Sequence, residues 1–248
     1  MLFDFRVFLG QSFDGTRQTA PELLKVMDTS HIDMALVCPF KPLSYNINDA
    51  NIELSQVIST HSDRLIGAAR LDPWQPDACE NLRRSFDSLD FHALYLNPRE
   101  EQFQSDSEML DPLMGIAEEY CAPVVIATGF PWVSEALQVL KLALRWPGVS
   151  IVMTNGGQIN ITGLGQADVT LALSRSPNLF MDTAGVYRQD FIEETIETIG
   201  SERVLFGSGS PYFDQAFEVR RVALLKVSGD DLQRIQSDNA MRLLSLNH

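Results

Sequence analysis

Two charged side chains are the strongest candidates for chemistry, because each lies near the end of a short apolar run. Arg6 belongs to the run Leu2–Leu9, and Asp182 closes the run Leu179–Asp182. A guanidinium binds a carboxylate or phosphate through paired N–H groups, and a positioned carboxylate can serve as a general base. Structural roles are the alternatives: Arg6 can form a buried ion pair with Asp4, and Asp182 can cap the turn that follows it or pair with an arginine.

Further polar side chains also follow apolar runs and are predicted to contact a substrate. They are Arg70, Tyr95, Asn97, Thr154, Asn155 and Ser208. Tyr95 and Asn97 would share one face of a strand, since alternate residues of a strand point the same way. Arg99 could add positive potential beside them. Hydrogen bonds from such groups would orient a small anionic molecule.

Eight apolar, β-branched runs recur along the chain, and helical patterns lie between them. The runs are Leu2–Leu9, Asp33–Cys38, Leu65–Leu71, His92–Leu96, Pro123–Ala127, Val149–Met153, Leu179–Asp182 and Arg203–Gly207. Their starts are about 29 residues apart, the length of one strand with its crossover helix. The helical patterns include Ala20–Thr29, Ala50–Ser59, Ser107–Tyr120, Val133–Leu144 and Asp190–Ile199. Thr19 and Glu22 have the spacing of a capping box before the first of these helices.

Eight strand–helix units predict an α/β fold, a (β/α)8 TIM barrel forming a single domain over residues 1–248. The competing fold is an open doubly wound sheet, which would carry a G-x-G-x-x-G loop after its first strand. Gly10–Gly15 lacks the middle glycine of that motif. A barrel places functional residues at the C-terminal ends of its strands, which would bring the candidates above to one mouth. Strand alternation predicts that Asp4, Arg6 and Phe8 point into this barrel.

Taken together, the strand endings resemble those of the amidohydrolase superfamily, in its amidohydrolase-related (type 2) branch of metal-dependent hydrolases and decarboxylases. The resemblance rests on Phe3-Asp4, Asp63–Gly67, Pro123–Ile126, Asn178–Thr183, Arg203–Pro211 and Asn239–Leu244, in this order over nearly the whole chain. It implies a TIM barrel with an H-x-H motif ending the first strand, histidines ending the fifth and sixth, and an aspartate ending the eighth.

At those positions this sequence carries different residues: Arg6 and Phe8, Ala127, Thr154 and Gly209. A transition-metal site needs several imidazole, thiolate or carboxylate ligands that converge on one point. The four histidines are His31, His61, His92 and His248, and none ends a predicted strand. We therefore expect no catalytic metal and no other cofactor.

Composition limits the partners. The 248 residues carry a formal charge of −14, which argues against nucleic acid or an anionic membrane as a main partner. No run approaches 18 uninterrupted apolar residues. Asp4 and Arg6 interrupt the first apolar run, and three widely spaced cysteines suit a reducing compartment. A cytoplasmic protein is the expectation.

Two functions remain open. The first is an amidohydrolase-like barrel without a metal, acting as a binding or partner subunit (a pseudoenzyme). Its partners would be a small anionic molecule and a second copy of the chain or an active amidohydrolase relative. The alternative is a metal-independent hydrolase or lyase acting on a small carboxylic acid, lactone or amide. In that case Arg6 would anchor the substrate and Asp182 would act as acid or base.

Overall fold

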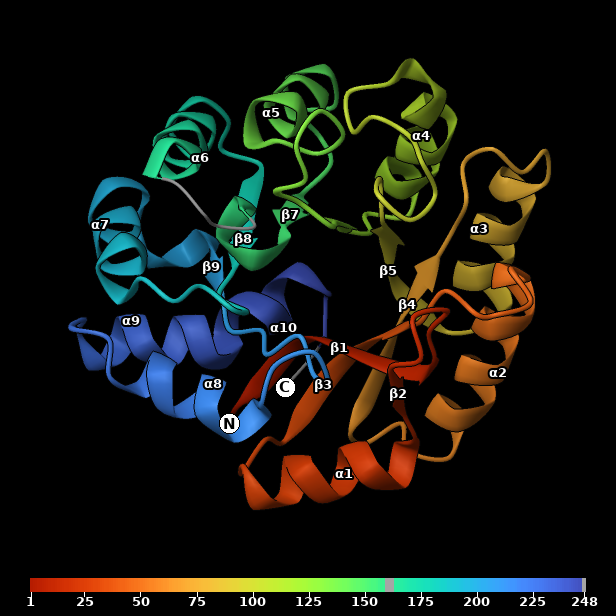
Figure 1. The fold of residues 1–248 in the computed structure, drawn as a ribbon, viewed down its shortest axis with the longest axis horizontal. Helices are drawn as coiled ribbons and strands as arrows, with labels where there is room; N and C mark the ends of the chain where they lie inside the picture. Colours follow the sequence, from red (N-terminus) through yellow and green to blue (C-terminus); the bar gives the residue numbers. More distant parts are fainter. Residues whose placement is uncertain (159–162, 247–248) are drawn as a thin grey trace.

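The fold is a parallel β-barrel surrounded by helices (Figure 1). A computed structural model describes residues 1–158 and 163–246. Within these residues the strands form one sheet in the order β2-β1-β3-β4-β5-β6-β7-β8-β9, and only the β1–β2 pair is antiparallel. The strands are β1 Phe3–Gln11, β2 Arg17–Gln18, β3 Met34–Pro39, β4 Leu65–Arg70, β5 Phe91–Leu96, β6 Val124–Ile126, β7 Ile151–Met153, β8 Leu179–Asp182 and β9 Val204–Leu205.

Backbone hydrogen bonds between β1 and the segment that contains β9 close the sheet into a barrel. Phe5 N donates to Phe206 O, Gly209 N to Arg6 O, and Phe8 N to Ser210 O, each at 2.8 Å. A parallel bridge also joins Val7 to Ser210. The predicted (β/α)8 TIM barrel is therefore confirmed, and the open doubly wound sheet is excluded.

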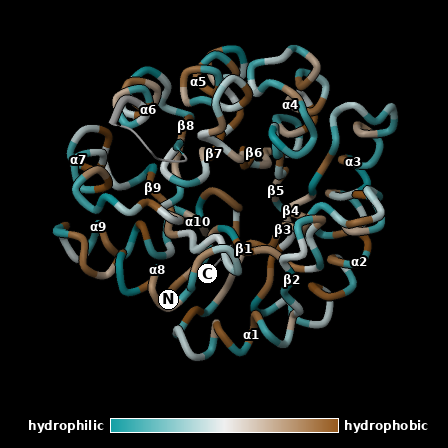
Figure 2. The backbone as a smooth tube through the Cα atoms, viewed as in Figure 1, coloured by the Kyte–Doolittle hydropathy of each residue, from teal (hydrophilic) through white to brown (hydrophobic). Residues whose placement is uncertain are grey.

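The helices are α1 Ala20–Thr29, α2 Ile47–Ser59, α3 Ala78–Ser88, α4 Asp111–Glu119, α5 Ala136–Arg145, α6 Gly163–Arg175, α7 Gln189–Ile199, α8 Gln215–Ala223, α9 Gly229–Gln233 and α10 Asn239–Leu243. All except α10 lie in a ring outside the strands (Figure 1). Figure 2 shows hydrophobic and hydrophilic stretches alternating along α1, as expected for an amphipathic helix packed on a sheet. None of the helices in the described residues is long and apolar enough to cross a membrane.

The sequence patterns predicted several boundaries of strands and helices. Each of the eight predicted strands overlaps a parallel strand, while Leu179–Asp182 and α1 have the predicted bounds at both ends. The capping box before α1 is confirmed: Glu22 N donates to Thr19 Oγ1, and Thr19 N donates to Glu22 Oε2. This pair satisfies two amide groups that the first helical turn leaves without partners, and so helps to start the helix at Ala20.

Two apolar cores hold the barrel together. The outer core, between strands and helices, includes Val7 and Leu9. The inner core fills the barrel and includes Phe3, Phe5 and Phe8. Helix α10 contributes to the inner core and is tied to the first residue of β9, because Asn239 Nδ2 donates to Val204 O. It therefore covers the N-terminal end of the barrel and leaves the C-terminal end as the mouth.

A β-bulge in β1 overturns the prediction that Asp4 points into the barrel. Between Asp4 and Val7 the register with β3 shifts by one residue. An extra residue in a strand breaks the alternation of its side chains. As a result, the neighbours Phe5 and Arg6 both face the interior, whereas Asp4 turns toward Gln215 of α8.

Candidate functional site at the barrel mouth

A buried ion pair between Arg6 and Asp182 joins β1 to β8 at the mouth. Arg6 Nε donates to Asp182 Oδ2 at 2.6 Å, and Arg6 Nη2 lies 3.4 Å from Oδ1. Asp182 has no exposed surface, and Arg6 is 5% exposed. Burial by itself lowers the pKa of Arg6, but the charge and the hydrogen bond of Asp182, together with smaller contributions from its neighbours, raise the pKa overall, so the guanidinium stays protonated. The prediction that Asp182 pairs with an arginine is confirmed, and the predicted ion pair of Arg6 with Asp4 is wrong.

Asn155 holds this ion pair from the end of β7. Its Oδ1 accepts from Arg6 Nη2 at 3.2 Å, its backbone N donates to Asp182 Oδ1 at 2.7 Å, and its Nδ2 donates to Ala184 O at 3.1 Å. The backbone of Asn155 is left-handed, with φ at 58°. Asparagine tolerates this conformation better than most residues. The turn thus directs all three polar groups of one residue at the pair and its loop.

A cavity of about 610 Å³ opens above the ion pair. Aromatic side chains make up much of its wall: Phe8, Phe13, Phe40, Tyr95, Phe130, Tyr187, Tyr212 and Phe213. The remaining lining residues are Arg6, Asp14, Arg70, Asn97, Arg99, Glu100, Ala127, Thr154, Asn155, Gln158 and Gly185. Its volume lies within the range of small-molecule sites, and apolar walls with a few converging polar groups are typical of them.

Of the aromatic wall, only Phe8 and Tyr95 were predicted from the sequence to face the interior or the mouth of the barrel. Phe8 and Phe40 stack with ring centroids 5.2 Å apart, and Tyr212 meets Phe8 edge to face at 5.8 Å. The available signal was position, because Phe40 directly follows the β3 strand and Phe8 lies beside Arg6 in β1. Packed rings of this kind form a rigid apolar surface that suits a flat ligand.

Besides Arg6 and Asn155, five residues were predicted to contact a substrate, and three of them line the cavity with usable polar groups. Tyr95 Oη accepts from Asn97 Nδ2 at 3.3 Å, and burial raises the pKa of the Tyr95 phenol, so its proton remains available for donation. Thr154 Oγ1 accepts from Thr128 N at 3.1 Å, which leaves its hydroxyl proton for a ligand. Tyr95, Asn97 and Thr154 therefore stay candidate contacts.

The fourth, Ser208, does not reach the cavity. It is fully buried below the mouth, where its N donates to Asp4 Oδ1 at 2.7 Å and its Oγ accepts from Ser210 N at 3.1 Å. The backbone at this point follows β1 rather than facing the cavity. The geometry gives Ser208 a structural role in the barrel seam, not the predicted role in substrate contact.

Arg70 lines the cavity, but its donors are already engaged. Its Nε and Nη2 donate to Glu101 Oε1 at 3.2 and 2.8 Å, Nη2 also pairs with Glu100, and Nη1 lies 3.4 Å from Pro39 O. Although burial lowers the pKa of Arg70, the charges of Glu101 and Glu100 raise it overall. Lys41 adds a further cation 3.7 Å from Glu101. Arg70 therefore braces the loops after β3 and β5.

The environment of Asp182 favours its structural role over acid–base catalysis. Its two oxygens accept from Arg6, from Asn155 N and, at 3.1 Å, from Ala184 N. The last of these bonds caps the turn after β8, as the structural interpretation predicts. Asp182 is not among the residues that line the cavity. A ligand proton would have to pass Arg6 to reach it.

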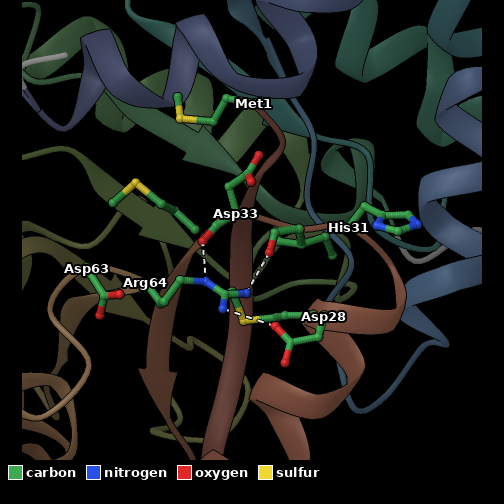
Figure 3. A pocket seen from close by; sticks show the side chains of 9 residues that line it. Met1, Asp28, His31, Asp33, Asp63 and Arg64 are labelled. Carbon is green, nitrogen blue, oxygen red and sulfur yellow. Dashed lines mark hydrogen bonds and ion pairs between the residues drawn. The ribbon is translucent and has the colours of Figure 1, made fainter.

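A second hollow, of about 810 Å³, lies at the opposite end of the barrel and contains His31 (Figure 3). Arg64 crosses it, donating to Asp33 O at 2.6 Å, to Ile32 O at 2.9 Å and to Asp28 Oδ1 at 3.0 Å. The ring of His31 points away from the Asp28–Arg64 pair. These contacts hold the turn before β3 in place. The C-terminal mouth, where charged groups converge, is the better candidate site.

The residues at the mouth do not fit a catalytic metal. Within residues 1–158 and 163–246, no three His, Cys, Asp or Glu side chains gather as a possible metal site. Of the carboxylates on the cavity wall, Glu100 is paired with Arg70, and Asp14 accepts from Thr16 N at 2.8 Å. The guanidinium of Arg6 adds a fixed positive charge, which would repel a divalent cation. His248 lies outside the described residues.

A family model described as "Amidohydrolase" matches residues 44–246. The chain belongs to the amidohydrolase family. This confirms the resemblance drawn from the strand endings, and the match spans the barrel from the loop before α2 to the last described residue. No curated protein gives a significant match.

Solved structures share the fold of this amidohydrolase-family chain at low sequence identity. A 2,6-dihydroxybenzoate decarboxylase in complex with 2,6-dihydroxybenzoate has a TM-score of 0.81 at 17% identity, with 100% of both chains covered. A 5-carboxyvanillate decarboxylase from Sphingomonas paucimobilis has a TM-score of 0.76 at 17% identity, covering 93% of this chain and 84% of its own. An uncharacterized TIM-barrel protein from Bordetella bronchiseptica has a TM-score of 0.80 at 15% identity, with 98% of both covered. At these identities the likeness establishes the fold alone.

Proposed function

We propose that this amidohydrolase-family barrel binds a small planar carboxylate at its mouth without a catalytic metal, and so acts as a binding or partner subunit. The observation that carries the proposal is the hydrogen bonding of the Arg6 guanidinium. Its Nε and Nη2 are held by Asp182 and Asn155, whereas Nη1 donates no hydrogen bond to any described residue. A guanidinium fixed on one edge and open on the other is a ready anchor for a carboxylate.

The surroundings of Arg6 support the same ligand. Tyr95 lines the same cavity, with its ring edge to face against Phe8 at 5.6 Å between centroids, and its hydroxyl can donate to the second oxygen of a carboxylate. Above them, the stacked rings of Phe8 and Phe40 offer a flat apolar surface. Benzoate is the simplest probe that combines these features. The complex of a structural neighbour with 2,6-dihydroxybenzoate agrees with this choice.

Binding can be measured by titration calorimetry with benzoate, with benzamide as a neutral control of the same shape. We expect benzoate to bind at least tenfold more tightly than benzamide, because the anion alone uses the charge of Arg6. Tyr95→Phe should weaken benzoate binding several-fold, the effect of about one lost hydrogen bond. Arg6→Lys keeps the charge beside Asp182 but removes the planar fork, and should weaken it about tenfold or more.

The matched control is Arg84→Gln, which removes one exposed positive charge from α3, outside the cavity. Its affinity for benzoate should equal that of the unmodified protein. Equal binding of benzoate and benzamide, or benzoate binding that is unchanged in both Tyr95→Phe and Arg6→Lys, would refute the proposed site.

Metal content gives a second test of the proposal. Protein purified without chelators should carry well under one equivalent of zinc, iron or manganese by elemental analysis. Adding each metal should leave the melting temperature unchanged, because the described residues supply no convergent ligand set. Panels of lactones, small amides and aromatic acids should give no turnover with or without these metals. Stoichiometric metal at the mouth, or turnover that depends on it, would contradict a metal-free binding role.

A further inference from the structure

Arg99 is an exposed cation on the wall of the mouth cavity, and its acidic neighbours are directed away from it. It follows β5 in a turn where Asn97 O accepts from Glu100 N at 3.1 Å and from Glu101 N at 3.0 Å. Asn97 Oδ1 also accepts from Glu100 N, at 3.2 Å. These bonds fix the shape of the turn that presents Arg99.

Both acidic residues of this turn are committed to another cation. Glu100 and Glu101 pair with Arg70, and Glu101 also faces Lys41. In the described part of the chain Arg99 forms no ion pair. Its positive charge therefore differs from those of Arg6 and Arg70, which already have carboxylate partners.

The contact that Arg99 does make leaves its charge available. Its guanidinium carbon lies 4.9 Å from the ring centroid of Phe130, another lining residue. A ring attracts a guanidinium through its negative face but carries no formal charge. The contact with Phe130 therefore leaves the charge of Arg99 without a carboxylate partner among the described residues.

We infer that Arg99 is a second anion-binding residue, and that the ligand of the cavity is a planar molecule with two anionic groups, one at Arg6 and one at Arg99. The inference rests on the proposed function, since Arg6 holds the first carboxylate. Asp14 is the other exposed charge on the lining, and it accepts from Thr16 N and, at 3.3 Å, from Tyr212 Oη. A ligand with a second anion is thus favoured on the Arg99 side of the cavity and disfavoured beside Asp14.

The test compares benzoate with the 1,2-, 1,3- and 1,4-benzenedicarboxylates on the unmodified protein by titration calorimetry. We expect at least one dicarboxylate to bind tenfold or more tightly than benzoate, because only it can reach both arginines. The isomer with the largest gain reports the spacing of the two sites. The gain should shrink as salt rises from 50 to 500 mM, since the rim is exposed and its charge is screened.

Two variants test whether Arg99 causes the tighter binding of the dicarboxylate. In Arg99→Gln the dicarboxylate should bind no more tightly than benzoate, whereas benzoate itself should keep its affinity within twofold. Arg84→Gln, with the same change of charge outside the cavity, should retain the full gain. Dicarboxylates that bind no better than benzoate, a gain that survives Arg99→Gln, or loss of benzoate binding in Arg99→Gln would each overturn the inference. If benzoate binding to the unmodified protein is absent, the proposed function fails instead, so the two failures are distinguishable.

Discussion

Asp182→Asn should lower the free energy of unfolding by about 3–5 kcal/mol, the usual cost of breaking a buried ion pair by removing one partner. Arg6 would remain in a site where it is only 5% exposed, without the carboxylate that balances its charge. An asparagine amide oxygen can still accept hydrogen bonds, but the side chain supplies no negative charge. For a chain of this size, the loss corresponds to a fall of about 6–20 °C in melting temperature.

Two further variants separate charge pairing from other effects. Arg6→Met combined with Asp182→Asn removes both charges and should be more stable than Asp182→Asn alone, because no buried charge is left unpaired. Asp190→Asn breaks an exposed ion pair, in which the side chain of Asp190 is 55% exposed and that of Arg188 is 40% exposed. It should therefore change the melting temperature little. Denaturant unfolding and calorimetry measure all three.

The Asp182→Asn variant also tests whether Asp182 takes part in catalysis. If this carboxylate were a general base, Asp182→Asn would remove a measurable, EDTA-resistant turnover by about two to four orders of magnitude. We expect a change in stability and no turnover to lose. A melting temperature equal to that of the unmodified protein, together with loss of such turnover, would favour the metal-independent enzyme over the binding subunit.

The position of the Arg6–Asp182 pair could be predicted from sequence because barrel topology itself brings strand ends together. Each residue lies near the end of an apolar run, and a closed barrel directs those ends to one mouth. The strands were recognisable since they are buried on both faces and read as mainly apolar segments, although Asp4 and Arg6 interrupt the first. The apolar composition of the strands and the geometry of a closed barrel were therefore sufficient to place Arg6 and Asp182 at the same mouth.

Other features depend on contacts that no local pattern contains. The bulge between Asp4 and Val7 is defined by the pairing of β1 with β3, so strict alternation misplaced Asp4. Arg70 lies 30 residues from Glu100, and its pairing with two carboxylates arises only when the end of β4 meets the loop after β5. Ser208 was misassigned for a similar reason, because the seam with β1 determines which way its hydroxyl faces.

Asp4 carries the largest expected effect of pH. Its buried carboxylate accepts from Ser208 N at 2.7 Å, from Gln215 Nε2 at 2.8 Å and, more weakly, from Arg6 N at 3.4 Å. Burial outweighs these bonds and raises the pKa of Asp4 from 3.8 to about 6. Gln215 Oε1 is buried and has no hydrogen-bond partner among the described residues. If the side-chain amide of Gln215 rotated by about 180°, this oxygen could accept a hydrogen bond from the protonated carboxyl group of Asp4.

A raised pKa means that the folded chain binds the proton more tightly than the unfolded chain. Stability from this group is therefore fully present below pH 3.8 and is lost as the pH rises through about 6. A shift of about two pKa units corresponds to about 3 kcal/mol between these limits. Asp4→Asn cannot ionise and should escape this loss, while its amide can both accept from Ser208 N and donate to Gln215 Oε1.

We therefore expect the free energy of unfolding of Asp4→Asn, relative to the unmodified protein, to rise by about 2–3 kcal/mol between pH 4 and pH 7.5. Urea unfolding at half-unit pH steps measures this difference, and comparison at each pH cancels the titration of other carboxylates. Asp63→Asn is the matched control, because it removes an exposed carboxylate and should show no such rise. A difference that stays constant across this range, or falls with pH, would mean that Asp4 is ionised in the fold at no cost, and that its three hydrogen bonds fully replace the water it loses.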